Sequence, residues 1–390
     1  MKIESYRETW VEIALDHLTD NIKAFKGILS PETALMAVVK ADGYGHGAIE
    51  TAKAAIEAGA TYLAVAFLDE AISLRKAGFS TPILVLGYTS LDTETIEMAI
   101  DYGITLTIYS KEAVESIQKL AIQKKKVCRI HLKIDSGMNR IGVRTAEEAL
   151  QIIAAITSDY LVFEGIFTHF SDADAIESTF VHDQFNHFMK IVSSIQKKGY
   201  TIPIKHCCNT AATIAFPKMH LDMVRIGIGI YGLYPEEHLR TKISLKPVMT
   251  FKTKPILIKE VPVGQTISYG RTYTTTKDSI VATIPVGYAD GLSRTLSNKG
   301  HITVNGHKAP IVGRVCMDQT MVDLTEIDPV YFNEEFVLFG DPLDGAISIG
   351  EVADQMGTIH YEVACLIGKR VPRIYINHNK IINSTELIQS

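Results

Sequence analysis

From Leu18 to Gly232 the sequence alternates short apolar runs with longer amphipathic stretches. The apolar runs are rich in Val and Ile and nearly continuous, which is typical of parallel strands buried on both faces. Eight such runs alternating with helical patterns predict a (β/α)8 barrel; an open doubly wound sheet is the alternative, but the count of eight favours closure. The runs span 34–40, 62–67, 82–87, 104–109, 127–135, 161–168, 202–208 and 222–227, and the main helical patterns span 49–58, 69–77, 92–100, 111–122, 146–156 and 181–198.

After Leu239 the pattern changes to short strand-like runs that Gly and Pro turns separate. This pattern predicts a mainly antiparallel β domain with one helix at 349–356. The segment Thr9–Ala14 alternates like a strand, and we expect it to cross over and pair with that domain. We therefore predict a barrel over 15–239 and a β-rich domain over 1–14 and 240–390. Its strands are expected at 249–254, 256–261, 279–284, 301–304, 309–315, 320–324, 335–339 and 371–376.

Composition narrows the class of protein. Hydrophobic residues make up 46% and charged residues 21% of the chain, with a net charge of −5, so neither a disordered chain nor a nucleic-acid-binding protein is expected. The basic run Lys124–Lys126 is expected to close a helix. Since the N-terminus lacks an apolar core segment and no run approaches ~20 apolar residues, we expect a cytoplasmic protein without a signal peptide or membrane span. Five cysteines without a C-x-x-C pair predict buried, reduced thiols and no metal site.

Candidate chemistry lies where the barrel strands end, because active sites of such barrels form at that face. Lys40 ends a buried apolar run and opens a glycine-rich loop. Burial disfavours its ammonium form and frees an amine for Schiff-base formation, although a lysine that snorkels to the rim is equally consistent. The strand ends together are cationic and suit a phosphate ligand: Lys40, Lys133, Arg140, His169, Asn209, Thr210, Arg225, Gly227 and Ile228.

The loops after the seventh and eighth strands are the usual phosphate site of such barrels. Gly227 would let backbone N–H groups approach phosphate oxygens. Residues 227–232, GIGIYG, also match a dinucleotide-binding pattern, but no helix pattern follows and no acidic residue lies about 20 positions on, so we discount that reading. For Arg225 the alternative is a core ion pair with Asp222, and for His169 a structural role.

Two segments of the second domain also carry polar chemistry. Tyr269 lies in the bend SYGR at 268–271, where an exposed turn aromatic is the simpler interpretation. The segment VCMDQ at 315–319 surrounds Met317 with polar groups. Cys316 has no arranged histidine partner, so we expect a buried structural thiol rather than a nucleophile.

Taken together, these segments resemble the alanine racemase family over nearly the whole chain and in the family's order. The matching motifs are AVVKADGYGHG (37–47), LKIDSGMNRIGV (132–143), FTHFSDAD (167–174), HCCNTAA (206–212), VRIGIGIYGLYP (224–235), SYGRTY (268–273), VGYADG (286–291), GRVCMDQTMVD (313–323) and YEVACLIGKRVPR (361–373). Departures are modest: Cys207 and Cys208 replace the small residues usual after the histidine, and Thr210 stands where serine is common.

The resemblance implies a pyridoxal-phosphate-dependent racemase that interconverts L- and D-alanine and supplies D-alanine for peptidoglycan. Lys40 would hold the cofactor as a Schiff base and act as the base on one face of the substrate α-carbon. Tyr269 of the partner subunit in a head-to-tail homodimer would be the base on the opposite face. Racemisation needs two such groups, because the proton leaves one face and returns to the other.

The family also implies roles around the cofactor ring. Arg225 would face the pyridine nitrogen with His169 bonded to it; because arginine stays protonated, the ring becomes a poorer electron sink. Arg140 would bind the phenolic oxygen and the substrate carboxylate, helped by the backbone of Met317 of the partner subunit. Lys133, at a position often carbamylated, would orient Arg140. The phosphate would be held by Tyr44, Thr210, Gly227, Ile228 and Tyr361, and Asn209 would also belong to the cofactor site. Arg294 and Arg314 would line the entrance.

Three alternatives remain at this point. A decarboxylase on the same plan would place an acid at the pyridine nitrogen and a cysteine in the second domain, so Arg225 and Tyr269 argue against it. A racemase of broader specificity is excluded only by substrate profiling. Single-barrel proteins that bind the cofactor without evident catalysis lack a second domain, which this chain has.

Overall fold

The computed structural model describes residues 6–176, 179–327 and 329–385. The chain divides into two compact units. One comprises Thr19–Gly43 and Ala48–Leu245; the other comprises Met1–Leu18, Tyr44–Gly47 and Lys246–Ser390. Residues 1–5 of the predicted second-domain segment lie outside the described residues. Within the described part of the chain, no helix is long and apolar enough to cross a membrane.

The first unit is built on an eight-stranded sheet in which every neighbouring pair is parallel. The strands are largely buried, as the apolar runs predict. They follow the order β8-β7-β6-β5-β4-β3-β2-β9. Their bounds are β2 Ala34–Val38, β3 Tyr62–Val65, β4 Ile83–Val85, β5 Thr105–Ile108, β6 Cys128–Lys133, β7 Leu161–Phe167, β8 Ile204–His206 and β9 Met223–Ile226.

Two backbone hydrogen bonds join the remaining edges, β8 and β9. The Asp222 N–H donates to the Lys205 carbonyl at 3.1 Å, and the Arg225 N–H donates to the Cys208 carbonyl at 3.0 Å. The sheet therefore closes into a barrel, which confirms the predicted fold class. Each predicted run holds one strand, but the strands are shorter than the runs because the apolar pattern continues into the loops that follow.

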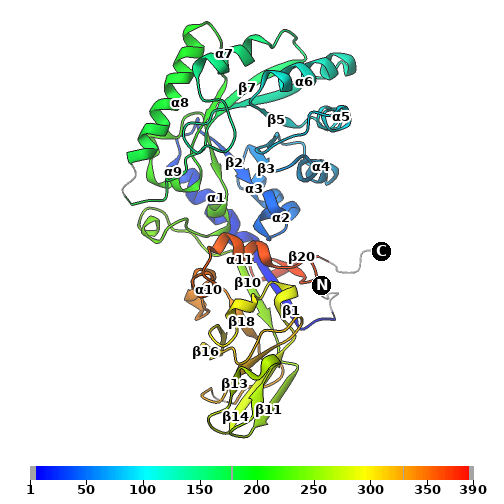
Figure 1. Ribbon diagram of the computed structural model, residues 1–390, viewed down its shortest axis with the longest axis vertical. Coiled ribbons are helices and arrows are strands. Elements are labelled where there is room, and N and C mark those ends of the chain that lie inside the picture. The colour runs from blue at the N-terminus through cyan, green and yellow to red at the C-terminus, as the bar shows by residue number, and fades with distance from the viewer. Residues whose placement is uncertain (1–5, 177–178, 328, 386–390) are drawn as a thin grey trace. The chain divides into compact units, whose positions relative to one another are not determined.

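The helices of this unit lie outside the strands (Figure 1). Local signals fix their ends: Asp92, Ser110 and Thr145 cap the helices that follow them, and Lys125 ends the helix that Ser110 begins, in a left-handed conformation. The basic run thus closes a helix as predicted. The helices are α1 Leu15–Ile28, α2 Lys40–Tyr44, α3 Ala48–Glu57, α4 Leu68–Lys76, α5 Thr93–Asp101, α6 Lys111–Lys124, α7 Ala146–Ala154, α8 Thr179–Lys197 and α9 Thr210–Ala215, with short 3-10 turns η1 Pro217–Met219, η2 Ile228–Tyr231 and η3 Glu237–Thr241.

The second unit is mainly antiparallel. Its largest sheet has the order β16-β15-β18-β10-β1-β19-β20, and separate sheets contain β11-β14-β17 and β12-β13. The strands are β1 Thr9–Ala14, β10 Met249–Thr253, β11 Leu257–Val261, β12 Thr266–Ile267, β13 Tyr273–Thr274, β14 Ser279–Ile284, β15 His301–Val304, β16 His307–Pro310, β17 Thr320–Asp323, β18 Phe336–Phe339, β19 Arg373–Asn377 and β20 Lys380–Ser384. The helices are α10 Ile349–Met356 and α11 His360–Leu366, with turns η4 Tyr269–Arg271, η5 Tyr288–Asp290, η6 Arg294–Leu296 and η7 Pro342–Asp344.

Strand β1 pairs antiparallel with β10 and parallel with β19. The predicted crossover of Thr9–Ala14 is therefore confirmed, and its alternate residues Val11 and Ile13 are fully buried. The strand predicted at 309–315 is wrong beyond Pro310, because from Ile311 onward the chain leaves the β15-β16 hairpin and passes irregularly to β17. Helix α11 and the short strands β12, β13 and β20 were not predicted.

Candidate active site

Lys40 opens α2 instead of ending a strand, since β2 stops at Val38. The next residues, Ala41, Asp42 and Gly43, have left-handed φ angles of 51°, 52° and 62°. For residues other than glycine this conformation costs about 1–2 kcal/mol each. Glu70 holds the turn: one carboxylate oxygen accepts from the Ala41 N–H at 2.5 Å. Such strain is typical of functional loops and gives Lys40 a fixed setting at the barrel rim.

Arg225, on β9, lies at the centre of the carboxyl end of the barrel and is 3% exposed. Its guanidinium donates to the Thr168 carbonyl at 2.8 Å and the Cys207 carbonyl at 3.1 Å. It also donates to His206 Nδ1 at 3.0 Å and lies 3.3 Å from His169 Nδ1. All four are neutral acceptors. Among the described residues no carboxylate lies within ion-pair distance of this arginine.

The alternative ion pair of Arg225 with Asp222 does not form. The Asp222 carboxylate instead contacts Lys205 Nζ at 2.7 Å and accepts from the Lys205 N–H at 2.7 Å. Arg225 is therefore a buried cation without a direct counter-charge, which is costly unless something else compensates it.

A chain of buried side chains extends from Arg225. Because a guanidinium only donates, His206 Nδ1 accepts and its Nε2–H donates to His131 Nδ1, 2.8 Å away. His131 Nε2–H then donates to Glu164 at 3.1 Å, and the Tyr62 hydroxyl donates to the same carboxylate at 2.5 Å. Arginine chemistry thus fixes one tautomer at both histidines, and the chain ends on a carboxylate.

The electrostatics of this end of the barrel follow from burial. Desolvation lowers the pKa of Arg225 to about 10, so the guanidinium stays charged at neutral pH. Burial first, and Arg225 second, hold the pKa of His169, of His206 and of Lys133 well below their ordinary values. The site therefore combines a permanent cation with imidazoles and an amine whose charged forms burial disfavours, a setting suited to an anionic ligand.

Lys133, the last residue of β6, lies over the ring of Phe167, with Nζ 4.8 Å from the ring centroid. Its side chain is buried, whereas Arg140 is exposed. Arg140 nevertheless contributes to lowering the pKa of Lys133 and of His169. The structure thus brings Lys133, His169 and Arg225 into one cluster, with Arg140 at its edge.

The loops after β8 and β9 meet around Thr210. Its hydroxyl oxygen accepts from the Gly227 N–H at 3.1 Å. A Cβ on Gly229 would lie 2.5 Å from Phe25 and 2.7 Å from the Thr210 methyl group, so only glycine fits there. Asn209 caps α9, because its side-chain oxygen accepts from the Ala212 N–H at 2.9 Å. Ile228 opens a short 3-10 turn instead of the long helix of a dinucleotide-binding motif.

In the second unit Tyr269 is 73% exposed on η4. The turn is tight: Ser268 and Gly270 have φ angles of 66° and 72°. A Cβ on Gly270 would lie 2.9 Å from the Arg314 guanidinium carbon, so this cation packs directly beside the tyrosine bend. Arg294 is exposed.

The Met317 segment is likewise accessible, with the methionine 52% exposed. Cys316 is only partly buried and lies 3.6 Å from the Ser268 hydroxyl, and Cys365 is exposed. The expectation of uniformly buried thiols is therefore wrong for these two cysteines, because both lie in loop or helix-end positions at the surface. No disulfide joins any two of these five cysteines, all of which lie in the described part of the chain.

Tyr44 and Tyr361 pack together, with ring centroids 6.3 Å apart. Gly45 explains the close approach: a Cβ there would lie 2.2 Å from the Ala364 carbonyl oxygen of α11. The Arg373 guanidinium donates to the Gly45 carbonyl at 3.2 Å and to the Gly368 carbonyl at 2.7 Å. Gly45 therefore lets α11 pack against the short segment Tyr44–Gly47.

Sequence reasoning missed several residues of these clusters. His131, His206 and Glu164 alternate with apolar residues on buried strands, and that placement was the available signal. Asp290 and Arg370 lie inside family motifs, but nothing in their local sequence shows that they meet.

Known proteins agree with this arrangement. Residues 13–235 match the alanine racemase N-terminal domain and residues 248–375 the alanine racemase C-terminal domain. The chain is 55% identical to "Alanine racemase 2" of Oceanobacillus iheyensis, over 99% of this chain and 97% of that protein.

Solved structures give the same result. The Bacillus anthracis alanine racemase with bound L-Ala-P is 40% identical, with a TM-score of 0.92 over 98% of both chains. The Bartonella henselae alanine racemase with covalently bound pyridoxal phosphate is 27% identical, with a TM-score of 0.84 over 95% of this chain and 99% of that chain. Since both domain families and both kinds of relative cover nearly the whole sequence, this chain belongs to the alanine racemase family.

Proposed function

We propose that this chain is an alanine racemase that uses pyridoxal phosphate and two bases, Lys40 and Tyr269, from different subunits. The observation that carries the proposal is the buried guanidinium of Arg225, which neutral groups surround and no described carboxylate balances. This environment suits a ring nitrogen that accepts a hydrogen bond, and it argues against the acid that a decarboxylase of this plan would use there.

The residues of the barrel end fit the cofactor. Pyridoxal phosphate is anionic. The cluster of Arg225, Arg140 and Lys133 provides hydrogen-bond donors for its ring and its phenolic oxygen. Thr210, Gly227 and Ile228 would hold the phosphate, with Tyr44, Tyr361 and the cap residue Asn209 assisting. The Gly229 position, where a Cβ would collide with Thr210, shows that backbone and side chain are already in close contact there. When bound, the cofactor withdraws electrons from the substrate and so acidifies its α-hydrogen.

Each base has a setting that matches its role. The strained turn after Lys40 fixes where the lysine leaves the barrel rim. Tyr269 lies in a tight, exposed bend, and the Arg314 guanidinium packs beside this bend. One base removes the α-proton, and the other delivers a proton to the opposite face.

We assign substrate binding to hydrogen bonds that the protein donates to the carboxylate of alanine. Arg140 donates to it, and the Met317 N–H of the partner subunit assists. A carbamylated Lys133 would present an anion to Arg140 and orient it. The lowered pKa of Lys133 favours the neutral amine, which attacks carbon dioxide and releases a proton to give the carbamate. Arg294 and Arg314 line the entrance and attract an anionic substrate.

We infer a homodimer with shared sites, in the cytoplasm, that supplies D-alanine for peptidoglycan. The high exposure of Tyr269 and Met317 supports sharing, because residues that complete another subunit's site are exposed on their own chain. Both lie in the unit that follows the barrel.

The test measures D-alanine formed from L-alanine by the purified, cofactor-loaded protein. Lys40→Ala and Tyr269→Phe should each abolish turnover. Tyr331→Phe, which alters another exposed tyrosine of the same unit, should not. Comparable rates with L-serine would establish the broader-specificity racemase instead, and release of carbon dioxide would establish a decarboxylase.

A further inference from the structure

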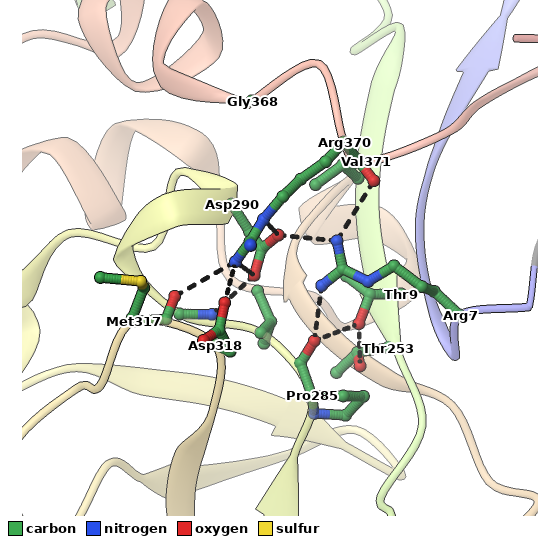
Figure 2. Close-up of polar contacts among 12 residues, drawn as sticks. Arg7, Thr9, Thr253, Pro285, Asp290, Met317, Asp318, Gly368, Arg370 and Val371 are labelled. Atoms are coloured by element: carbon green, nitrogen blue, oxygen red, sulfur yellow. Dashed lines mark hydrogen bonds and ion pairs between the residues drawn. The ribbon is translucent and has the colours of Figure 1, made fainter. Parts of the chain in front are cut away.

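Four charged side chains of the second unit form one network (Figure 2). Arg7, Asp290, Asp318 and Arg370 contribute two guanidiniums and two carboxylates, so the charges balance. The proposed chemistry gives no role to Asp290, Asp318 or Arg370, although each lies in a family motif: VGYADG, GRVCMDQTMVD and YEVACLIGKRVPR, respectively.

Asp290 is the buried centre of the network, with a side chain that is 0% exposed. Its carboxylate accepts from Arg370 Nε at 2.7 Å and from Arg7 Nη1 at 2.8 Å. It also accepts from the Gly287 N–H at 3.0 Å. Burial opposes the charge, but these hydrogen bonds outweigh it and lower the pKa of Asp290, while the pKa of Arg370 is raised. Both groups are therefore charged at neutral pH, and each fixes the other.

Arg370 extends from this centre to the Met317 segment, as Figure 2 shows. Its Nη2 donates to the Met317 carbonyl at 3.3 Å and to the Asp318 carboxylate at 2.5 Å. The backbone supports the same carbonyl, since the Ala289 N–H donates to it at 3.1 Å, and the Tyr288 N–H donates to the Cys316 carbonyl at 3.0 Å.

The two segments approach closely because of Gly287. A Cβ at this position would lie 2.3 Å from the Cys316 carbonyl oxygen and 2.4 Å from the Met317 carbonyl oxygen. The backbone at 287–289 therefore fixes both carbonyls from one side, and Arg370 adds its donor to the second one.

This arrangement sets the direction of the Met317 N–H. In a trans peptide the N–H points opposite to the preceding carbonyl, and the described residues contain no cis peptide. Because the Cys316 carbonyl faces Tyr288, the Met317 N–H faces away from 287–289. Among the residues that the structure describes, none accepts a hydrogen bond from this N–H.

The charge of Asp318 gives Arg370 a second effect. This carboxylate is 59% exposed and lies one residue from the Met317 N–H. Unpaired, it would repel another carboxylate that approached the same backbone, and the contact with Arg370 neutralises it.

We infer that Arg370, held by Asp290, is a positioning residue for the substrate carboxylate: it holds the Met317 carbonyl, and with it the segment that carries the Met317 N–H, and it neutralises Asp318. The inference rests on the proposed function, in which that N–H binds the alanine carboxylate. It gives the motifs around Asp290 and Arg370 a shared purpose in substrate binding.

The experiment compares alanine with ethylamine, which keeps the amine and methyl group but has no carboxylate. Arg370→Ala and Arg370→Lys are prepared in the cofactor-loaded enzyme. Arg370→Ala should raise KM for alanine about 10-fold or more, with a smaller change in kcat, because a charge-assisted contact that holds the carboxylate donor is lost. Ethylamine affinity, followed by cofactor absorbance, should stay unchanged. Arg370→Lys should recover part of the alanine affinity, since the charge returns.

Two further variants complete the test. Lys369→Ala removes an exposed cation from the adjacent position and should leave both affinities unchanged. Asp318→Asn in the Arg370→Ala background should restore part of the alanine affinity, because the unpaired carboxylate is gone. Equal weakening of alanine and ethylamine, or a lower Tm with unchanged KM, would overturn the inference. A wild-type protein that does not racemise alanine would overturn the proposed function instead.

Discussion

Two arginines at the functional ends of the two units are bound in opposite ways. Arg225 of the barrel is fully enclosed by neutral acceptors, namely two backbone carbonyls and two imidazoles. Arg370 of the β unit contacts two carboxylates, one of them completely buried. One cation thus has its direct counter-charges in place, and the other has none among the described residues.

The difference separates binding from positioning. A buried charge is expensive, so a cation without a paired carboxylate marks a place where an anionic ligand can complete the surroundings. A paired charge has no such need, and it fixes the backbone around it. Accordingly, Arg225 belongs to the proposed cofactor site, and Arg370 supports the proposed substrate site from behind.

The largest expected effect comes from removing the charge of Asp290, the buried centre of the network that also contains Arg7, Asp318 and Arg370. Asp290→Asn keeps the shape of the side chain but leaves Arg7 and Arg370 without their shared buried carboxylate. Removing one partner of a buried pair costs about 3–5 kcal/mol, so the free energy of unfolding should fall by this amount. Chemical denaturation measures it. Asp318→Asn changes a carboxylate at the exposed end of the same network. If Asp290→Asn lowers the free energy of unfolding no more than Asp318→Asn does, the buried carboxylate has no special part in stability.

The second prediction concerns Arg225, the barrel cation without a paired carboxylate among the described residues. Arg225→Glu places an acid beside the cofactor ring, where it favours a protonated ring nitrogen and a stronger electron sink. Racemisation should fall roughly 10²-fold, the scale for losing a directed donor, and transamination to pyruvate should appear. Pyruvate formation is followed with the cofactor-loaded enzyme. Arg240→Glu, at an exposed arginine of the same unit, serves as the control; a variant that forms no pyruvate would count against the assigned role of Arg225.

A smaller effect tests the close approach in the β unit. Gly287→Ala would place a methyl group against the Cys316 and Met317 carbonyls, and overpacking of this kind costs about 1–3 kcal/mol. Tm should fall, and KM for alanine should rise more than kcat changes. Gly264→Ala is the structural contrast, because its Cβ would meet no atom, and only its φ of 82°, unlike the extended backbone of Gly287, would be strained. If both variants shift Tm but neither shifts KM, Gly287 has no part in substrate binding.

The smallest effect is a pH dependence of barrel stability. Burial lowers the pKa of His131, of His169 and of His206 below the unfolded value near 6.5. Below about pH 6.5 the unfolded chain therefore binds more protons than the fold, so stability falls as pH falls, by at most about 1.4 kcal/mol per pH unit for each histidine. His206→Gln should flatten this slope, measured by denaturation between about pH 7 and 5, whereas His378→Gln at an exposed histidine should not. Identical slopes of stability against pH in the wild type and in His206→Gln would contradict the contribution assigned to His206.

Much of the fold could be predicted because its signals are local. The eight apolar runs lie on the barrel strands, and the alternation of Thr9–Ala14 was enough to predict its crossover. The setting of Lys40 could not be predicted in detail, because a left-handed turn with Ala41 and Asp42 depends on tertiary contacts such as Glu70.

The charged clusters show the same limit. Arg225 and His169 were found because both lie at strand ends of one barrel face. Asp290 and Arg370 are 80 residues apart, and only the folded chain brings them into contact. Periodicity reports which face a residue occupies, but it carries no information on which distant side chain meets it there.

The central claim is that the barrel of one chain and Tyr269 of the partner subunit form one site. Lys40→Ala and Tyr269→Phe proteins, each inactive alone, are mixed under conditions that exchange subunits. In a twofold dimer with shared sites, half of the dimers are mixed and each carries one intact site, so activity should return to about a quarter of wild type. If exchange is complete and no activity returns, the two bases belong to one chain and the shared site is wrong.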